Sequence, residues 1–498
     1  MAVRTWVSLA LLAGCHATPD GTTDLRPAPT DQGTTPTDTS TTHTGTWEHS
    51  GTTFVEHSAH TAEPTEPFVC PPVDVDVCGN GIDDDADGRT DCALEGITST
   101  PTSVAVTLDA SGVFPGGDLN GDGVQDLIGW TSIDNPVSRH AVSVFHGPIP
   151  AGTAPLLPAG SAVAQGFVMR EPIVSDLDHD GALDVVMGVG LVGASCNAAV
   201  PWEVYRFPIT AISGSVDAAT VAVGTLRKPA ALAGSTNAIY VSAIGDVNGN
   251  GSEDLMVQII ANCSDWQVHL VDSASIVGEV ELDTVSFARV DPGAGTPSRA
   301  FDLGDVDGDG LDDLVLAFVD GQGDGQIRVW PGGSLPSLVR VADATQVWQS
   351  AGSAFFENAL GGHDLTRDGT PDAVVSGRGD DGAVWVVELP TTSPTLNLET
   401  DAWSTTTVPP GATVLSRVGD LNGDGAPDLT YAVFQDAVRV DHAPCPGTHA
   451  LPVDGATSLY PAHAVFDATG DGIDDIVITM ETTYPWLGFG VFAGGSRP

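Results

Sequence analysis

Seven short acidic segments of the chain share one spacing of oxygen-bearing side chains. Each follows the pattern Asp-x-[Asp/Asn/Thr]-x-[Asp/Asn]-Gly-x-x-Asp, and they begin at Asp118, Asp176, Asp246, Asp305, Asp364, Asp420 and Asp467. A tight turn with this spacing aims the side chains at positions 1, 3, 5 and 9, and the main-chain carbonyl at position 7, toward one point. Ca²⁺ takes such hard oxygen ligands, roughly six to eight at about 2.3 to 2.6 Å.

The candidate calcium ligands are positions 1, 3, 5, 7 and 9 of each loop. They are Asp118, Asn120, Asp122, Val124 and Asp126; Asp176, Asp178, Asp180, Ala182 and Asp184; Asp246, Asn248, Asn250, Ser252 and Asp254; Asp305, Asp307, Asp309, Leu311 and Asp313; Asp364, Thr366, Asp368, Thr370 and Asp372; Asp420, Asn422, Asp424, Ala426 and Asp428; and Asp467, Thr469, Asp471, Ile473 and Asp475. Position 6 is Gly in every loop, which suits a backbone forced to positive φ. Without a cation the crowded carboxylates would repel one another. The pattern therefore predicts up to seven bound Ca²⁺ ions.

The loops differ in carboxylate content. Positions 1, 3, 5 and 9 carry 3, 4, 2, 4, 3, 3 and 3 carboxylates along the chain. The second and fourth loops are therefore predicted to bind Ca²⁺ most tightly, and the third loop, with Asn248 and Asn250, least tightly. The alternative for each loop is an Asx-turn that its own backbone satisfies without metal.

The residues after each loop distinguish two kinds of calcium site. An EF-hand needs Glu at position 12, on an exiting helix. Position 12 here is Gly129, Met187, Val257, Leu316, Val375, Tyr431 and Ile478. The runs after position 9, such as 314–317 and 476–478, are apolar and typical of buried strands. Each loop is therefore predicted to lead into a strand, and an EF-hand is excluded.

The loops recur at a regular interval. Successive first aspartates are 58, 70, 59, 59, 56 and 47 residues apart, and alternating apolar stretches that end in Gly follow at 142–147, 327–332 and 489–494. Units of this length, built from short strands, are typical of four-stranded propeller blades. The predicted fold is all-β, a seven-bladed β-propeller over residues 97–498.

The last unit is too short for a complete blade, because only 31 residues follow Asp467. Residues 103–108 alternate apolar and polar side chains, as a half-buried strand does. Proteins avoid open sheet edges. We therefore expect residues 103–108 to supply the missing strand and close the ring.

The aspartate loops and the Gly-terminated strands together resemble the FG-GAP and VCBS repeats, which are similar to the calcium-binding blades of the integrin α-subunit propeller. The resemblance covers about residues 98–498. The literal Phe-Gly and Gly-Ala-Pro pairs are mostly absent, and several loops carry Asn or Thr where Asp could stand. The resemblance implies a calcium-binding propeller whose sites differ in affinity.

The N-terminus carries an export signal, in which Arg4 precedes an apolar run, 6–12, too short to span a bilayer. The segment Leu12-Ala-Gly-Cys15 resembles a bacterial lipobox, which implies a signal peptide over 1–14 and a lipid anchor on Cys15. A plain signal peptide is the alternative. Residues 15–68 are rich in Thr, Pro and Ser, and we expect a disordered tether there. The predicted location is the outer membrane or cell surface of a bacterium.

An eighth acidic loop precedes the repeats. It repeats the spacing of the calcium loops at Asp83, Asp85, Asp87 and Asp91. With Cys78 and Cys92 on either side, it resembles the cysteine-flanked acidic loops of surface proteins from predatory and social bacteria such as myxobacteria. We expect a small metal-binding module over 69–96. The alternative is an acidic loop held only by its disulfide.

Six cysteines remain once Cys15 is set aside: Cys70, Cys78, Cys92, Cys196, Cys263 and Cys445. An even number in an exported chain indicates disulfides, although many connectivities are possible. Cys78 with Cys92 is the firmest pair, because the two bracket one short loop. Cys196 with Cys263, and Cys70 with Cys445, follow by elimination.

Composition limits the partners. With 66 acidic and 17 basic residues the net charge is −49, so nucleic acid and anionic membrane surfaces are excluded as direct partners. The glycine pattern at 377–382 has aspartates where a pyrophosphate would approach, and the chain has no Gly-x-Ser-x-Gly or His-Glu-x-x-His motif. The predicted function is calcium-dependent binding or adhesion to a protein or polysaccharide, without enzymatic activity.

Two other functions remain open: a structural surface spacer, and a propeller-fold polysaccharide lyase or hydrolase. Trp348 and Trp403 lie in segments without a strand pattern, where they could stack on sugar rings. Packing between blades is the commoner use of such residues. A cluster of exposed aromatic residues would favour binding, and a deep pocket with converging Asp, His or Arg would favour an enzyme.

Overall fold

The computed structural model describes parts of residues 103–492, all within one compact unit. The described residues are 103–106, 110–134, 138–149, 158–165, 167–168, 172–190, 202–229, 236–261, 265–293, 295–319, 324–350, 353–379, 382–409, 414–423, 425–433, 437–441, 446–450, 455–457, 463–483 and 486–492. The predicted signal peptide, lipid anchor, tether and cysteine-flanked module, and all seven cysteines, lie outside them. Within the described residues no helix has the length and apolar character that a membrane span requires.

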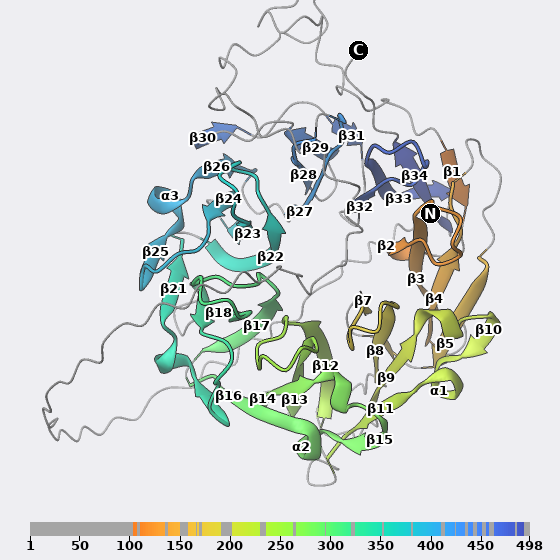
Figure 1. Ribbon diagram of the computed structural model, residues 1–498, viewed down its shortest axis with the longest axis horizontal. Helices are drawn as coiled ribbons and strands as arrows, with labels where there is room; N and C mark the ends of the chain where they lie inside the picture. The colour runs from red at the N-terminus through yellow and green to blue at the C-terminus, as the bar shows by residue number, and fades with distance from the viewer. Residues whose placement is uncertain are drawn as a thin grey trace, which may run out of the picture. The chain divides into compact units, whose positions relative to one another are not determined.

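Short β-strands make up most of the described chain, and the α-helices are single turns (Figure 1). The helical segments are α1 (Ala218–Val221), α2 (Leu282–Val285), α3 (Leu398–Asp401), η1 (Ile209–Ala211), η3 (Ser273–Ser275) and η4 (Val341–Asp343). β18 (Leu314–Val319) is buried along nearly its whole length, whereas β27 (Val414–Gly419) alternates buried and partly buried residues. The all-β prediction is confirmed.

Strand pairing defines a series of antiparallel sheets. The first contains β2 (Ala110–Gly117), β3 (Asp126–Asp134), β4 (Ser138–Phe145) and β5 (Gly160–Gln165). In the second sheet, β6 (Phe167–Val168) and β7 (Ile173–Ser175) both pair with β8 (Asp184–Gly190) and together take the place of the first strand. The third and fourth strands of this sheet are β9 (Trp202–Pro208) and β11 (Gly224–Arg227). The third contains β12 (Thr236–Ala243), β13 (Asp254–Ala261), β14 (Asp265–Asp272) and β16 (Ser286–Asp291).

The same order continues through the second half of the chain. The fourth sheet contains β17 (Thr296–Phe301), β18, β19 (Gly325–Trp330) and β21 (Gln346–Gln349). The fifth contains β22 (Ser353–His363), β23 (Asp372–Gly379), β24 (Ala383–Glu388) and β26 (Ser404–Thr407). The sixth contains β27, β28 (Asp428–Val433), β29 (Ala437–Asp441) and β31 (Gly455–Thr457).

An extra parallel strand covers the outer edge of each of the first five sheets. The extra strands are β10 (Gly214–Asp217), β15 (Gly278–Glu281), β20 (Leu338–Arg340), β25 (Thr395–Asn397) and β30 (Gly447–Ala450). Each lies in sequence between the third and fourth strands of the following sheet, yet pairs with the outer strand of the preceding one. Neighbouring sheets are thereby linked, and edges that would invite foreign strands are paired.

The remaining sheet joins the two ends of the repeat region. It contains β32 (His463–Phe466), β33 (Asp475–Thr483), β34 (Trp486–Phe492) and β1 (Ser103–Val106). β1 pairs antiparallel with β34, from Ser103 opposite Val491 to Val106 opposite Gly488. β2 lies against β32, and Ile149 N–H donates to the carbonyl of Ala468 at 3.0 Å. The predicted closure through this N-terminal strand is confirmed.

The sheets are arranged as the blades of a propeller, with β2, β7, β12, β17, β22, β27 and β32 innermost (Figure 1). The predicted count of seven complete blades needs correction. Consecutive strands build six blades, and the seventh loop belongs to the composite sheet, which has only three strands of its own and takes β1 from the other end. Seven loop motifs therefore do not correspond to seven self-contained blades.

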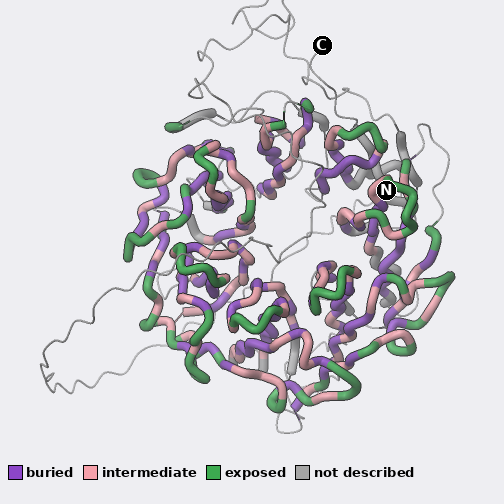
Figure 2. Tube along the Cα trace, in the orientation of Figure 1, coloured by how far each residue is buried: buried purple, intermediate pink, exposed green. Residues whose placement is uncertain are grey.

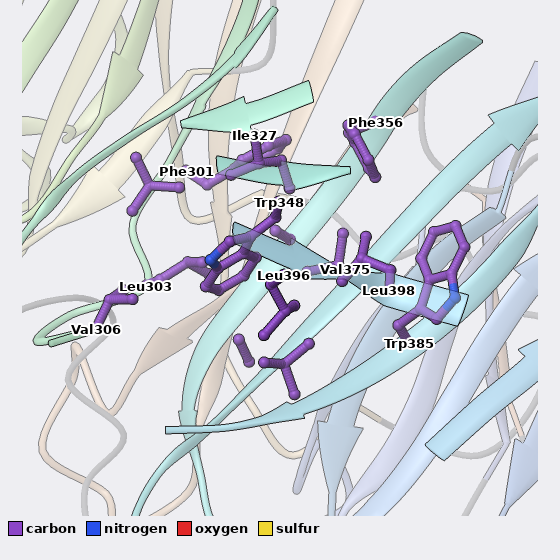
Figure 3. Close-up of a cluster of buried hydrophobic side chains, with 14 of the residues drawn as sticks. Phe301, Leu303, Val306, Ile327, Trp348, Phe356, Val375, Trp385, Leu396 and Leu398 are labelled. Carbon is purple, nitrogen blue, oxygen red and sulfur yellow. The ribbon is translucent and has the colours of Figure 1, made fainter. Parts of the chain in front are cut away.

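The core consists of apolar side chains packed between neighbouring sheets. Trp348 on β21 and Trp385 on β24 lie in one buried cluster (Figure 3). Buried segments recur around the ring of sheets (Figure 2). The indole of Trp348 is 0% exposed and donates from Nε1 to Oε1 of Gln346 at 3.1 Å. Trp403 is partly buried against another cluster. The packing interpretation of Trp348 is thus correct, and stacking on a sugar is excluded there.

Candidate metal centre

All seven repeat loops join the first strand of a sheet to the second. They therefore lie at the same end of the inner strands. The tips are mostly exposed, whereas the strands that follow are buried (Figure 2). Position 9 begins or immediately precedes the second strand in every loop, as the sequence predicts. Asp424 of the sixth loop lies outside the described residues.

The loop backbone is left-handed at two positions. At position 6, φ lies between 81° and 94° in all seven glycines, which confirms the prediction. At position 4 it is also positive, at Gly121, Gly249, Gly308, Gly423 and Gly470, and at the non-glycine residues His179 (55°) and Arg367 (61°). The positive φ at position 4 was not predicted, although glycine occupies this position in five of the seven loops.

The first aspartate of each loop is held by main-chain N–H groups. In the fourth loop, Gly308 and Asp309 donate to Oδ1 of Asp305 at 2.7 and 3.0 Å, and Gly310 donates to Oδ2 at 2.7 Å. The bond from position 6 recurs in every loop. In the first loop these bonds, led by that from Gly123, lower the pKa of Asp118. The ionised form that a metal requires is thus favoured.

Position 5 accepts a hydrogen bond from the N–H of position 7, for example from Leu311 to Oδ1 of Asp309 at 3.0 Å. The same bond occurs in five further loops. This is the Asx-turn that the metal-free alternative requires. It uses one lone pair of the side chain and leaves the others for a ligand. Ligation by the carbonyls at position 7 stays a prediction.

Position 9 has a structural role beyond the predicted metal ligation. These aspartates are between 0% and 4% exposed. Oδ2 of Asp313 accepts from the N–H groups of Val306 and Asp307, both at 3.0 Å, and Oδ1 accepts from Gly332 at 3.0 Å. The carboxylate therefore ties the start of the loop to the end of the third strand, with or without metal.

Among the described residues, two loops bring three carboxylates together. Oxygens of Asp305, Asp307 and Asp313 lie within 4.8 Å of one another, as do those of Asp176, Asp178 and Asp180. Two oxygens bound to one Ca²⁺ ion are separated by at most about twice the Ca–O distance of about 2.3 to 2.6 Å. These are the two loops with the most carboxylates, and both spacings fit that limit.

Two carboxylates of the fourth loop have raised pKa values. Burial, followed by the charge of Asp307, raises the pKa of Asp313 to about 7. Burial and the charge of Asp309 also raise the pKa of Asp307. A cation among these carboxylates would favour their ionised forms.

The second loop already contains a positive charge. Arg206 on β9 donates from Nε and Nη2 to Oδ2 of Asp184 at 3.1 and 2.8 Å. Its Nη2 also donates to Oδ2 of Asp178, and its Nη1 to the carbonyl of Ser273 at 3.2 Å. Burial opposes the charge on Arg206, but the two aspartates raise its pKa overall. The guanidinium therefore stays ionised inside the loop.

Acidic residues at position 8, absent from the predicted ligand set, link some neighbouring loops. Asp312 accepts from the N–H of Asp246 at 2.8 Å, and Asp474 accepts from the N–H of Asp420 at 2.9 Å. Glu253 lies close to Asp176, is 1% exposed, and has a pKa raised to about 7, chiefly by burial. The carboxylate of one loop thus caps the backbone at the start of the loop before it.

No protein-family model matches the chain. Similar solved structures include BBS1N in complex with ARL6DN, soaked with lead, with a TM-score of 0.36 and 10% identity over 80% of this chain and 94% of that one. Raptor from Chaetomium thermophilum has a TM-score of 0.40 and 9% identity over 80% of this chain and 29% of that one. An active polycomb repressive complex 2 in the basal state gives 0.43 and 9% over 80% and 98%. Scores this low do not bear on function, and the propeller assignment rests on the strand pairing.

Proposed function

We propose that the chain is a calcium-binding propeller that acts as a binding or adhesion module outside the cytoplasm. The observation that carries the calcium assignment is the fourth loop. Three of its carboxylates lie within 4.8 Å of one another, and the pKa of Asp313 is raised by burial and by a neighbouring carboxylate. Hard oxygen donors at this spacing suit Ca²⁺ in number and kind.

Calcium binding is tested by equilibrium dialysis of the chain against ⁴⁵Ca²⁺. The wild type should bind several ions, and Asp309→Ala should bind about one fewer, because position 5 supplies one of the side-chain ligands. Asp343→Ala is the matched control: Asp343 is an exposed aspartate outside the loops. Wild-type protein that binds no calcium at millimolar concentration would refute the assignment.

The binding role is supported by the propeller fold and by the strongly acidic composition, which suits cation-bridged or basic ligands. The exposed large apolar residues among those described are Val223, Val277, Leu311 and Leu338, none of them aromatic. A protein or a polysaccharide is the proposed ligand class. Glycan and protein arrays probed with and without calcium test this role, and no binding to either array would favour the spacer alternative.

Export and anchoring are part of the proposal and rest on the segment ending at Cys15. Two or more acyl chains on this cysteine would hold the protein stably at a membrane. Cys15→Ser should therefore release the protein into the soluble fraction or block its processing. Unchanged membrane retention of the variant would contradict lipidation.

A further inference from the structure

The second loop has an unusual neighbour on the third strand of its blade. In the register of each sheet, the residue two places after the position-9 aspartate faces one residue of the third strand. That residue is Val144, Arg206, Leu270, Val329, Val386, Val440 and Val491 along the chain. Six are aliphatic and one is arginine. The exception belongs to a loop with four aspartates.

Arg206 contacts two of the carboxylates that the sequence pattern assigns to a bound cation. Its side chain is 4% exposed and bridges positions 3 and 9 of the loop, Asp178 and Asp184. A planar guanidinium with five donors satisfies carboxylate oxygens in both charge and geometry. Its remaining contact, to the carbonyl of Ser273, fixes the group from the next sheet.

A metal ion in this loop would meet two obstacles. Asp178, one of the three clustered carboxylates, already accepts a hydrogen bond from Arg206. An ion bound there would lie beside the guanidinium of Arg206, whose side chain is 4% exposed. Like charges this close repel each other, most strongly on the buried side of the loop, at Asp184.

We propose that the guanidinium of Arg206 is a built-in replacement for calcium, so that the second loop is folded without metal while the other loops take Ca²⁺. The statement about the other loops rests on the proposed function. In the fourth loop, Val329 stands at the register of Arg206 and offers no charge. Its four aspartates are therefore left for a metal.

The test compares the same position in the two loops by equilibrium dialysis against ⁴⁵Ca²⁺ with the full chain. Asp307→Ala should lower the number of bound ions by about one. Asp178→Ala should leave it unchanged. Arg206→Leu, which installs the type of residue found in the other blades, should raise it by about one. Circular dichroism in calcium checks that each variant is folded.

The inference is overturned if Asp178→Ala and Asp307→Ala lower the number of bound Ca²⁺ ions equally. This pair of variants tests the inference even if Arg206→Leu does not fold. A folded Arg206→Leu that gains no ion would also overturn it. The same measurement tests the proposed function, calcium binding by the other loops, independently of the role of Arg206. A wild type that binds nothing, with one ion bound by Arg206→Leu, would refute calcium binding by the other loops and keep the role of Arg206. No binding in either protein would overturn both.

Discussion

The second and fourth loops have the same four aspartates at the same positions, yet their surroundings differ. In the second loop Arg206 supplies a buried positive charge, while in the fourth the matching strand position is Val329. Carboxylate content alone ranks the two loops as equal. A site in this fold therefore consists of the loop and the third strand together.

The largest expected effect is that of calcium on the whole propeller. Each ion bound only by the folded state adds about 1.4 kcal/mol at ten times its Kd, from RT ln(1 + [L]/Kd). Several loops should together lose several kcal/mol in chelator, and the melting temperature should fall markedly in calorimetry. Asp307→Ala should shrink this difference, whereas Asp178→Ala should not. Identical melting curves with calcium and with chelator would contradict calcium binding by the folded state, and with it the proposed difference between the second and fourth loops.

Arg206→Leu should destabilise the calcium-free protein by about 3 to 5 kcal/mol, because it leaves Asp184 buried without its partner. Urea unfolding in chelator measures this change. The matched control is Arg227→Leu in the same blade, where the arginine is 46% exposed and pairs with Glu203 and Glu279. Such a surface pair contributes at most about 1 kcal/mol. Similar losses in the two variants would mean that Arg206 has no special place in the second loop.

A smaller difference in stability is expected between variants of a strong calcium loop and a weak one. Asp309→Ala should lower the free energy of unfolding in calcium by about 1 to 3 kcal/mol, since it removes a charged ligand. Asn250→Ala should cost less, because the third loop offers only two carboxylates and Oδ1 of its Asp254 already accepts from Asn248 at 2.6 Å. A larger loss in Asn250→Ala would contradict the predicted order of affinities.

The smallest effect is on pH dependence. Burial and Asp307 raise the pKa of Asp313 to about 7, above the ordinary 3.8. The folded state therefore holds a proton that the unfolded chain releases, and this contribution is complete below about pH 4 and lost as pH rises through about 7. Unfolding free energy in chelator should fall between pH 5 and 7.5.

Calcium should reduce this pH dependence, because it stabilises the ionised form of Asp313. Asp313→Asn should remove the part of the pH dependence of the unfolding free energy that calcium suppresses. Asp184→Asn, in the loop that contains Arg206, should leave that part intact. The same calcium effect on the slope in both variants would contradict the difference between the loops.

Much of the fold followed from the sequence, because the motif spacing, the glycine at position 6 and the apolar runs after position 9 are local signals. The closing strand was also predictable, since the last unit is visibly short and a half-buried strand was expected over residues 103–108, of which 103–106 form β1. The parallel outer strands, such as β10 beside β5, were not. They pair residues of different repeats and leave no periodic pattern.

The candidate site was predictable in its ligand types but not in its charge balance. Arg206 lies 22 residues after Asp184 and Val329 lies 16 after Asp313, so no fixed spacing marks the shared position. Only the strand register aligns the two residues. The buried role of position 9 was hidden for a similar reason, because its partners, such as Gly332, come from another strand.

The most direct test of the account is anomalous diffraction from crystals of the full chain grown with calcium, recorded where calcium scatters anomalously. The account predicts a peak among Asp305, Asp307, Asp309 and Asp313, and none in the second loop, where the guanidinium of Arg206 should contact Asp178 and Asp184. Peaks of equal height in the two loops would contradict the role of Arg206. The absence of a peak in the fourth loop would contradict calcium binding itself.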